Sequence, residues 1–391
     1  MKSSITIAFI LLSIAISSCR RGHTILFSND GNRLEISSSG EIKLSEDETT
    51  IQSISQMGYL KFIHNEDELY AEPKNGVIQY ELYKHGNRLD PKTDDGKLFI
   101  SSVVKDLIAS GFDAKDRLAR LYARGGTAAV IKEIPNLSMD NVKTMYVEFL
   151  MSNDSATDEK LISAANVIAT QIGADYEKSK LLSDNVAAYT KDSVLTASWI
   201  KAVLSIGADY EKVKCFKGML QENLNDNQIL AVLKASKNLG ADYDKTQILS
   251  TIMDNKSFAA SHFQEILAYN GEFGADYDKL NMTKKLLSQR ELPDGDAYAD
   301  LLAFMDKLGS DMDKSTLLNT VLEKGPKNED QWISLIKSSS KLSNGLDKSN
   351  MLVNISKKMP VSDKIKDAYM TAAKSLDNEM DYARAVKAVE R

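Results

Sequence analysis

The chain has 391 residues, a formal net charge of −6 at pH 7 and a hydrophobic fraction of 43%. This composition describes a mildly acidic protein with mixed surface charge. A basic stripe with interleaved aromatic residues, which is typical of nucleic-acid binding, is missing from the sequence. We therefore expect no nucleic-acid partner.

Residues 1–18 are predicted to be a lipoprotein signal peptide. Lys2 supplies a positive charge ahead of a short apolar run, Ile5 to Ile16, which is too short to span a bilayer comfortably. The run ends in Ile16-Ser17-Ser18-Cys19, which resembles the bacterial lipobox, where cleavage precedes the cysteine and the thiol is lipidated. We expect lipidation at Cys19 to attach the protein to a membrane; the alternative is an ordinary secreted protein with a chance cysteine.

The residues around Cys19 also bear on location and on the second cysteine. Arg20 and Arg21 follow it, whereas acidic residues at this place are associated with surface export in some bacteria. We expect a lipid-anchored protein of the bacterial cell envelope, in the outer membrane facing the periplasm, with the cell surface as the alternative. Cys215 would then be the remaining thiol, without a disulfide partner in the chain.

Residues 19–90 are predicted to form a small antiparallel β-domain. Runs of alternating, β-branched or aromatic residues, best seen at 77–83, are separated by turn signals such as Ser39-Gly40 and Asn75-Gly76. Three of the four histidines lie here without metal-ligand spacing, so that turn positions are the preferred interpretation: His23, His64 and His85. We predict no metal site and no cofactor.

Residues 91–136 are predicted to form irregular helices that cap the N-terminal end of a repeat array. The preceding stretch, Asp90 to Gly96, lacks the glycine that a calcium loop carries at its sixth position, and we interpret it as a linker. Helical periodicity begins at Leu98, Gly125-Gly126 ends a helix, and Ile134-Pro135 breaks another.

Residues 137–391 repeat a motif of Gly-Ala-Asp-Tyr followed by an acidic residue and lysine. Intact copies occur at 173–178, 207–212, 240–245 and 274–279, and weaker copies precede and follow them. The motif lysines, with Tyr382 in the last copy, are spaced by 33 to 35 residues, which indicates an α-solenoid. The predicted fold is therefore mainly α: a small N-terminal antiparallel β-domain followed by about eight helix-hairpin repeats.

Each motif is interpreted as the end of one helix and the start of another. The glycine is expected to adopt the left-handed conformation after a helix, and the aspartate to cap the next one. Five aspartates form a candidate partner-binding ladder on one edge: Asp175, Asp209, Asp242, Asp276 and Asp311. The preferred alternative is that each caps its own helix beside a solvated lysine. The motif tyrosines are expected to pack against the neighbouring repeat.

Part of the chain resembles a known family. Tyr80-Glu81-Leu82 with Gly86, residues 111–121, Gly125-Gly126 and the Asp-Tyr-Glu-Lys repeats are similar to the extracytoplasmic tail of antirepressor-type (beta-lactam-sensor-like) membrane metallopeptidases. The resemblance covers residues 55–391. The chain has no His-Glu-x-x-His motif and no multi-pass membrane region, so the resemblance implies no peptidase activity.

The sequence contains no nucleophile elbow, Walker loop, dinucleotide fingerprint or zinc quartet, and we expect no enzymatic activity and no catalytic residues. The expected function is a lipid-anchored scaffold for a protein or peptide partner, with a role in envelope sensing. The alternative is a structural or adhesive surface lipoprotein that binds polysaccharide or host matrix.

Overall fold

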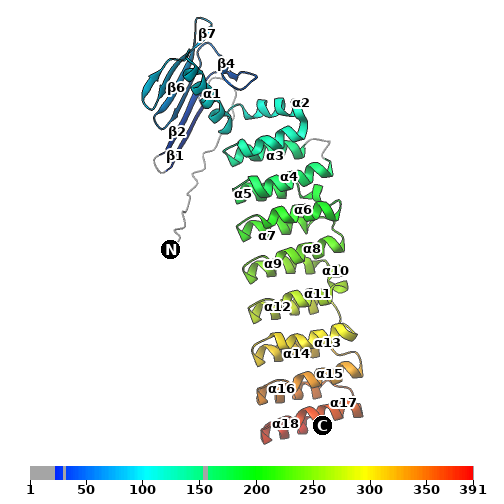
Figure 1. The fold of residues 1–391 in the computed structure, drawn as a ribbon. Helices are drawn as coiled ribbons and strands as arrows, with labels where there is room; N and C mark the ends of the chain where they lie inside the picture. Colours follow the sequence, from blue (N-terminus) through cyan, green and yellow to red (C-terminus); the bar gives the residue numbers. More distant parts are fainter. Residues whose placement is uncertain (1–22, 30–31, 153–156, 391) are drawn as a thin grey trace. The chain divides into compact units, whose positions relative to one another are not determined.

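The computed structural model describes residues 23–29, 32–152 and 157–390, so the predicted signal peptide and Cys19 lie outside the described residues. The described chain is mainly α, with an N-terminal antiparallel sheet followed by helices packed in pairs, as predicted (Figure 1). It divides into two compact units, Met1–Tyr146 and Val147–Arg391. Every described helix is too short or too polar to cross a membrane.

The first unit contains a six-stranded antiparallel sheet and a two-stranded ribbon. In spatial order the sheet consists of β1 (His23–Asn29), β2 (Asn32–Ser39), β5 (Tyr59–His64), β6 (Asp67–Lys74), β7 (Val77–Lys84) and β8 (Asn87–Leu89). The ribbon pairs β3 (Ile42–Leu44) with β4 (Ile51–Ile54). The β6–β7 turn has positive φ at Asn75 and Gly76, as a tight hairpin requires. His85 also has positive φ and lies in a turn, as predicted, whereas the same prediction is wrong for His23 and His64, which are end residues of β1 and β5.

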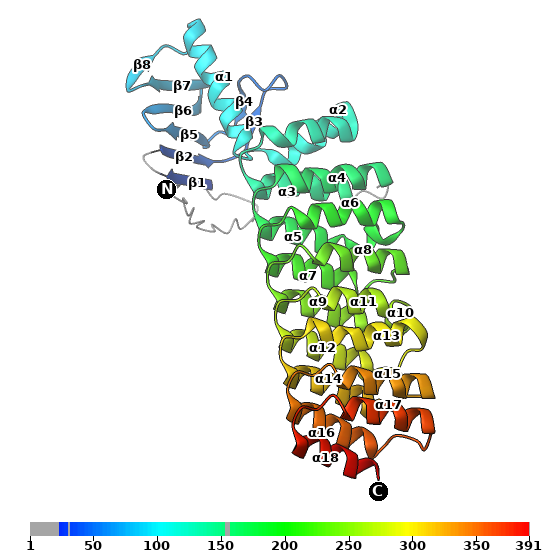
Figure 2. The same ribbon diagram turned by 60° about the horizontal axis from the view of Figure 1, so that its bottom comes forward.

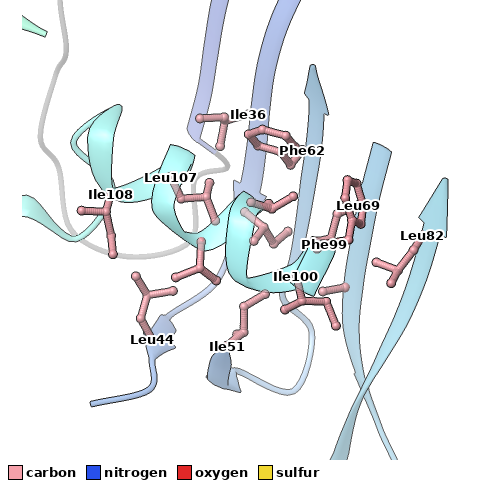
Figure 3. Packing of buried hydrophobic residues seen from close by; sticks show 14 of the residues in the cluster. Ile36, Leu44, Ile51, Phe62, Leu69, Leu82, Phe99, Ile100, Leu107 and Ile108 are labelled. Carbon is pink, nitrogen blue, oxygen red and sulfur yellow. The ribbon is translucent and has the colours of Figure 1, made fainter. Parts of the chain in front are cut away.

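Helix α1 (Asp94–Ala109) covers one face of this sheet. Its apolar side chains, including Phe99, Ile100 and Leu107, pack with Phe62 and Leu82 in a single buried cluster (Figure 3). We predicted α1 to cap the repeat array, but it supplies six of the 15 buried residues in the core of the β-domain. A sheet with one apolar face must bury that face, and α1 is the amphipathic element that follows it directly in the chain.

The predicted linker, Asp90 to Gly96, is an ordered start to α1. Thr93 is the N-cap, and its hydroxyl accepts a hydrogen bond from the Gly96 backbone N–H. A Cβ atom on Gly96 would lie 2.1 Å from the Asp90 carbonyl oxygen, so only glycine fits here.

Helix α2 (Ala114–Glu133) follows, with non-helical backbone angles at Gly125 and Gly126 where a break was predicted. A short 3₁₀ turn, η1 (Ile134–Asn136), comes after it, and α3 (Asp140–Ser152) spans the boundary between the units. The buried Arg117 of α2 donates hydrogen bonds to Glu48, in the β3–β4 connection, and to Glu133. This ion-pair cluster therefore fastens α2 to the ribbon.

The second unit is an array of paired helices. One layer, here called the motif layer, contains the helices that begin at the motif: α5 (Asp175–Asp184), α7 (Asp209–Met219), α9 (Asp242–Asp254), α12 (Asp276–Ser288), α14 (Asp311–Lys324), α16 (Gly345–Ser356) and α18 (Glu379–Val389). Each of these packs against the next one (Figures 1 and 2).

The second layer contains the intervening helices. They are α4 (Asp158–Gln171), α6 (Ser193–Leu204), α8 (Asp226–Ser236), α10 (Lys256–Ser261), α11 (Phe263–Asn270), α13 (Gly295–Ala303), α15 (Glu329–Ser339) and α17 (Asp363–Ala373), with short 3₁₀ turns η2 (Val186–Thr190) and η3 (Phe304–Lys307). The position three residues after the motif lysine, or after Tyr382 in the last copy, is here called the core column; it is buried at Leu181, Cys215, Ile248, Leu317, Met351 and Ala385. Met282 is the exception in this unit, since it is only half-buried.

Candidate functional site

The motif residues lie along one edge of the array, where second-layer helices end and motif-layer helices begin. The four intact motifs place aspartate as the first residue of its helix, and alanine occupies the N-cap position before it. The prediction that aspartate is the N-cap is therefore wrong. At the first helical position the carboxylate still favours the positive end of the helix dipole, but it is free to turn toward a neighbour.

Each aspartate instead holds the motif turn of the following repeat. Asp175 accepts hydrogen bonds from the backbone N–H groups of Gly207 (2.9 Å) and Ala208 (2.8 Å). The same contact recurs along the edge: Asp209 accepts from Gly240 N–H (2.8 Å), Asp242 from Gly274 (2.6 Å) and Ala275 (3.1 Å), Asp276 from Gly309 (2.6 Å), and Asp311 from Asn344 (2.5 Å). We call this contact the clasp.

The clasp also explains the motif glycine. None of the motif glycines is among the described residues with positive φ, so the prediction of a left-handed conformation is wrong. A Cβ atom on Gly207 would lie 3.0 Å from the Asp175 carboxylate, and one on Gly309 would lie 3.1 Å from that of Asp276. Glycine is needed because the carboxylate of the preceding repeat approaches the backbone closely.

The motif lysine completes the junction from the other side of the turn. Lys178 donates to the Ser205 carbonyl (3.0 Å), and Lys279 donates to the Lys307 carbonyl (2.9 Å). Lys279 also donates to Asp276 (3.2 Å), three residues earlier on the same helix face. Both lysines are buried, so the expected solvated lysine is wrong at these positions. At these junctions the aspartate accepts hydrogen bonds from N–H groups of the motif turn in the next repeat, and the lysine donates a hydrogen bond to a carbonyl group beside the same turn.

The electrostatics agree with this geometry. The Gly240 N–H and Lys212 hold the pKa of Asp209 below its ordinary value, and the Gly309 N–H does the same for the pKa of Asp276. Burial acts to raise the pKa of Asp242, but the N–H groups of Ala275 and Gly274 outweigh it, and the pKa is lowered. The half-buried carboxylates of the candidate ladder are thus bonded within the array, and a role for them in partner binding stays a prediction.

The motif tyrosines point in a different direction. They are exposed rather than packed between repeats, so that prediction is wrong. The same repeat position continues with apolar residues, and the exposed fraction across all seven lies between 53% at Leu346 and 81% at Met380. We call this set the apolar column: Tyr176, Tyr210, Tyr243, Tyr277, Met312, Leu346 and Met380.

Helix geometry accounts for this exposure. Aspartate and lysine are three residues apart and share the face that meets the next repeat, whereas the residue just after the aspartate projects from another face. The i, i+3 spacing of Asp242 and Lys245 around Tyr243 contained this signal in the sequence. The clasp and the apolar column are therefore two consequences of one helical turn.

A metal centre and a cavity are the other kinds of candidate site, and the described residues give them less support. Among the described residues, no group of three or more histidine, cysteine, aspartate or glutamate side chains is placed to hold a metal ion. A cavity of about 460 Å³ opens near the start of α13, with Arg290, Glu291, Asp294 and Lys327 in its wall. Three of these charges are paired, since Lys327 lies 3.4 Å from Glu291 and 3.3 Å from Asp294. No histidine or cysteine lines this cavity.

Neither a protein-family model nor a curated protein matches this chain. Of the predicted relationship, the fold alone is supported: an N-terminal antiparallel sheet followed by helices packed in pairs. The resemblance to the metallopeptidase tail stays a prediction.

Proposed function

We propose that the helical array is a non-enzymatic scaffold that binds an extended segment of a partner protein along the apolar column. The observation that carries this proposal is the exposure of seven large side chains, one per repeat, at the same position. Single exposed apolar residues are ordinary, whereas seven at one repeat position lie along a single edge of the array, where a partner can contact several of them. Tyrosine and methionine are also enriched in protein interfaces.

The clasp supports the same function because it fixes the backbone beneath the column. Tyr243 is flanked by Asp242 and Lys245, which lie 3.6 Å apart, and Asp242 holds the turn of the next repeat. A recognition surface on rigid elements loses little conformational entropy when a partner binds. The column therefore offers preorganised contacts rather than a flexible patch.

The predicted lipobox supports the further proposal that this scaffold is tethered in the bacterial envelope through lipid on Cys19. Replacing the cysteine, Cys19→Ser, should move the protein from the detergent-rich phase to the aqueous phase in a phase-partition assay. Unchanged partitioning of the variant would contradict the anchor.

A second candidate function is binding of polysaccharide by the β-domain. The sheet face opposite α1 carries Tyr59 and Tyr70, with ring centroids 6.0 Å apart and planes 21° apart. Such a pair can stack on sugar rings. A Tyr59→Ser and Tyr70→Ser double variant that keeps its binding to cell-wall polysaccharide would exclude this face as the site.

Site-specific photo-cross-linking tests the scaffold. A photoreactive phenylalanine analogue replaces Tyr210 or Tyr243, and the matched control carries it at Val194, which is 65% exposed at the start of α6 on the other edge (Figure 1). We expect one protein to cross-link from both column positions in intact cells and not from the control. Absence of a cross-link, or the same products from Val194, would refute the proposal.

A further inference from the structure

We propose that the cavity at the start of α13 binds a small monocarboxylate ligand, whose carboxylate group is held by Arg290. This inference is independent of the proposed scaffold function. The cavity lies where motif-layer helices end and second-layer helices begin, on the edge opposite to the motif turns (Figure 1). The inference rests on the unpaired guanidinium, on the charges around it and on the size of the cavity.

Arg290 is an exception in a part of the chain that otherwise uses lysine for positive charge. It is the only arginine between residues 125 and 383, a stretch that contains many lysines. The corresponding residues of the two neighbouring repeats, at the same distance from the motif lysine, are Lys256 and Gly325. Arginine differs from lysine because its planar guanidinium can hold both oxygens of a carboxylate at once. The sequence thus places a side chain suited to carboxylate binding at this cavity.

The guanidinium of Arg290 is only partly satisfied by the fold. Its Nη1 donates to the carbonyl groups of Ala259 (3.3 Å) and Ala260 (3.1 Å) near the end of α10, and its Cζ lies 4.7 Å from the centre of the Phe263 ring. Within the described part of the chain, Nε is buried without a hydrogen-bond partner, and Nη2 is unpaired but not buried. The edge of the guanidinium formed by Nε and Nη2 is therefore vacant.

Arg117 shows what the same edge holds when a carboxylate is present. Its Nε and Nη2 donate to the two carboxylate oxygens of Glu48, at 2.7 Å and 2.9 Å. No carboxylate of the described residues forms an ion pair with Arg290, and burial lowers the pKa of its guanidinium because no anion compensates for the lost hydration. A ligand carboxylate would supply this partner, first at Nη2 and then at Nε through a small rotation of the guanidinium.

The other charges of the cavity wall favour a ligand with a single negative charge. Lys327 lies 3.4 Å from Glu291 and 3.3 Å from Asp294, so these three side chains together carry one excess negative charge. They oppose a dianion such as phosphate more strongly than a monoanion. One unpaired guanidinium matches one carboxylate group.

The size and lining of the cavity suit a small ligand with an apolar part. Its volume of about 460 Å³ lies within the range of small-molecule sites, about 300–1,000 Å³. Phe263, Leu292 and Pro293 contribute apolar atoms to the wall, on the same cavity as the guanidinium. A short aliphatic group beside the carboxylate can therefore contact the protein.

The first turn of α13 adds a second feature that favours an anion. This turn reaches the cavity wall at Ala297. The N-cap residue Asp294 makes no side-chain bond to the turn, because its carboxylate accepts a hydrogen bond from Gln331 (3.0 Å) and pairs with Lys327. The backbone N–H groups and the positive end of the helix dipole thus add to the attraction that Arg290 exerts on a carboxylate.

A titration followed by nuclear magnetic resonance tests the site. The side-chain Nε–H signal of Arg290 is identified by its loss in Arg290→Lys, and the mature protein is titrated with N-acetyl-leucine or with N-acetyl-leucinamide, which lacks the carboxylate. We expect N-acetyl-leucine to shift this signal and to bind at least about tenfold more tightly than the amide. Equal affinities, or an unchanged Arg290 signal at about 10 mM N-acetyl-leucine, would overturn the inference.

Three further probes identify the class of carboxylate. Tighter binding of leucine than of N-acetyl-leucine would support a free amino acid, whose ammonium group can pair with Glu291 or Asp294. Tighter binding of N-acetyl-Ala-Ala-Leu would support the carboxylate end of a peptide, and equal affinities would support recognition of the carboxylate group alone. Tighter binding of inorganic phosphate than of every carboxylate would overturn the assignment to monocarboxylates.

Two variants of α13 locate the ligand without altering Arg290. Ala297→Glu introduces a competing carboxylate into the cavity wall and should weaken binding of N-acetyl-leucine at least about tenfold. Ala299→Glu is the matched control, because Ala299 is exposed on the same helix and lies outside the cavity wall, and it should leave the affinity unchanged. Wild-type affinity in Ala297→Glu would place the ligand elsewhere and overturn the inference.

Arg290→Lys separates ligand binding from a purely structural role. Lysine keeps the charge and can still donate to the carbonyl groups at the end of α10, but it lacks the planar edge. In calorimetric titration we expect N-acetyl-leucine to bind at least about tenfold more weakly. A lower melting temperature with unchanged affinity would show that Arg290 only caps α10 and would refute the inference. Tyr243→Ser should leave carboxylate binding unchanged, so failure of this site and failure of the scaffold function are measured separately.

Discussion

Replacing Asp242 with alanine removes the clasp at one junction of the array. The carboxylate loses its bonds to the N–H groups of Gly274 (2.6 Å) and Ala275 (3.1 Å) and its ion pair with Lys245 (3.6 Å). Bonds to charged groups contribute about 1.5–3 kcal/mol each, but both turn residues are exposed and their N–H groups can bind water instead. We therefore assign about 1 kcal/mol to each bond and expect the variant's free energy of unfolding to be about 2 kcal/mol lower than that of the wild type.

Asp244 provides the matched control. It lies in the same first turn of α9, so its removal costs a similar interaction with the helix dipole, about 0.3–1 kcal/mol. Asp244 accepts a hydrogen bond from the Gln247 side chain of its own helix, at 3.5 Å. Asp244→Ala should thus be clearly less destabilising than Asp242→Ala, and Asp242→Asn should lie between them, because asparagine keeps one acceptor without the charge.

The assay combines urea unfolding of the mature protein with hydrogen exchange at the junction. Long repeat arrays can unfold in parts, so the exchange of the Gly274 and Ala275 amides gives the local measurement. A loss of about 2 kcal/mol corresponds to exchange about 20- to 30-fold faster at these amides in Asp242→Ala. Equal destabilisation by the two alanine variants, or unchanged exchange at the turn, would refute the clasp as a stabilising contact.

Three further predictions concern acid, a buried cation and the thiol. The pKa values of Asp209 and Asp276 are lowered in the folded protein. The two carboxylates therefore contribute fully to the free energy of unfolding above about pH 5, and this contribution is lost as the pH falls through the lowered pKa values. The urea midpoint of an Asp209→Asn and Asp276→Asn double variant should therefore differ from wild type near neutrality and converge with it at acid pH; a constant difference would contradict this. Arg117→Met leaves two half-buried carboxylates unpaired and should destabilise the first unit by about 3–5 kcal/mol in thermal unfolding. Burial raises the pKa of the Cys215 thiol, so iodoacetamide should label it only in denaturant, and rapid labelling of the folded protein would show that the core column is open.

Much of the repeat fold was predictable because its signals are local. Each helix start, helix end and apolar stripe lies within a few residues of the motif, and the constant period repeats them along the chain. The interpretation of the motif itself was less successful. Gly274 meets Asp242 from 32 residues away, and a glycine that follows a helix gives the same sequence signal whether it needs a left-handed turn or space for a neighbour.

In the β-domain, too, local patterns were predictable from the sequence, whereas contacts between residues far apart in the chain were not. The strand pattern and the turn at Asn75-Gly76 depend on neighbours in sequence and were predicted. The amphipathic pattern of α1 also identified a helix, but no local property states which apolar surface it will cover. Only the structure places Phe99 and Leu107 on the sheet, and only the structure joins Arg117 to Glu48 from 69 residues away.

The clasp always joins one repeat to the next and always runs in the same direction along the chain. Excision of a complete repeat, for example residues 242–275, would join Ala241 to Asp276 and recreate an intact motif at the seam. Duplication of a complete repeat has the same property. Gene-level gain or loss of whole repeats can therefore lengthen or shorten the array, and with it the reach of its surface, without the invention of a new junction.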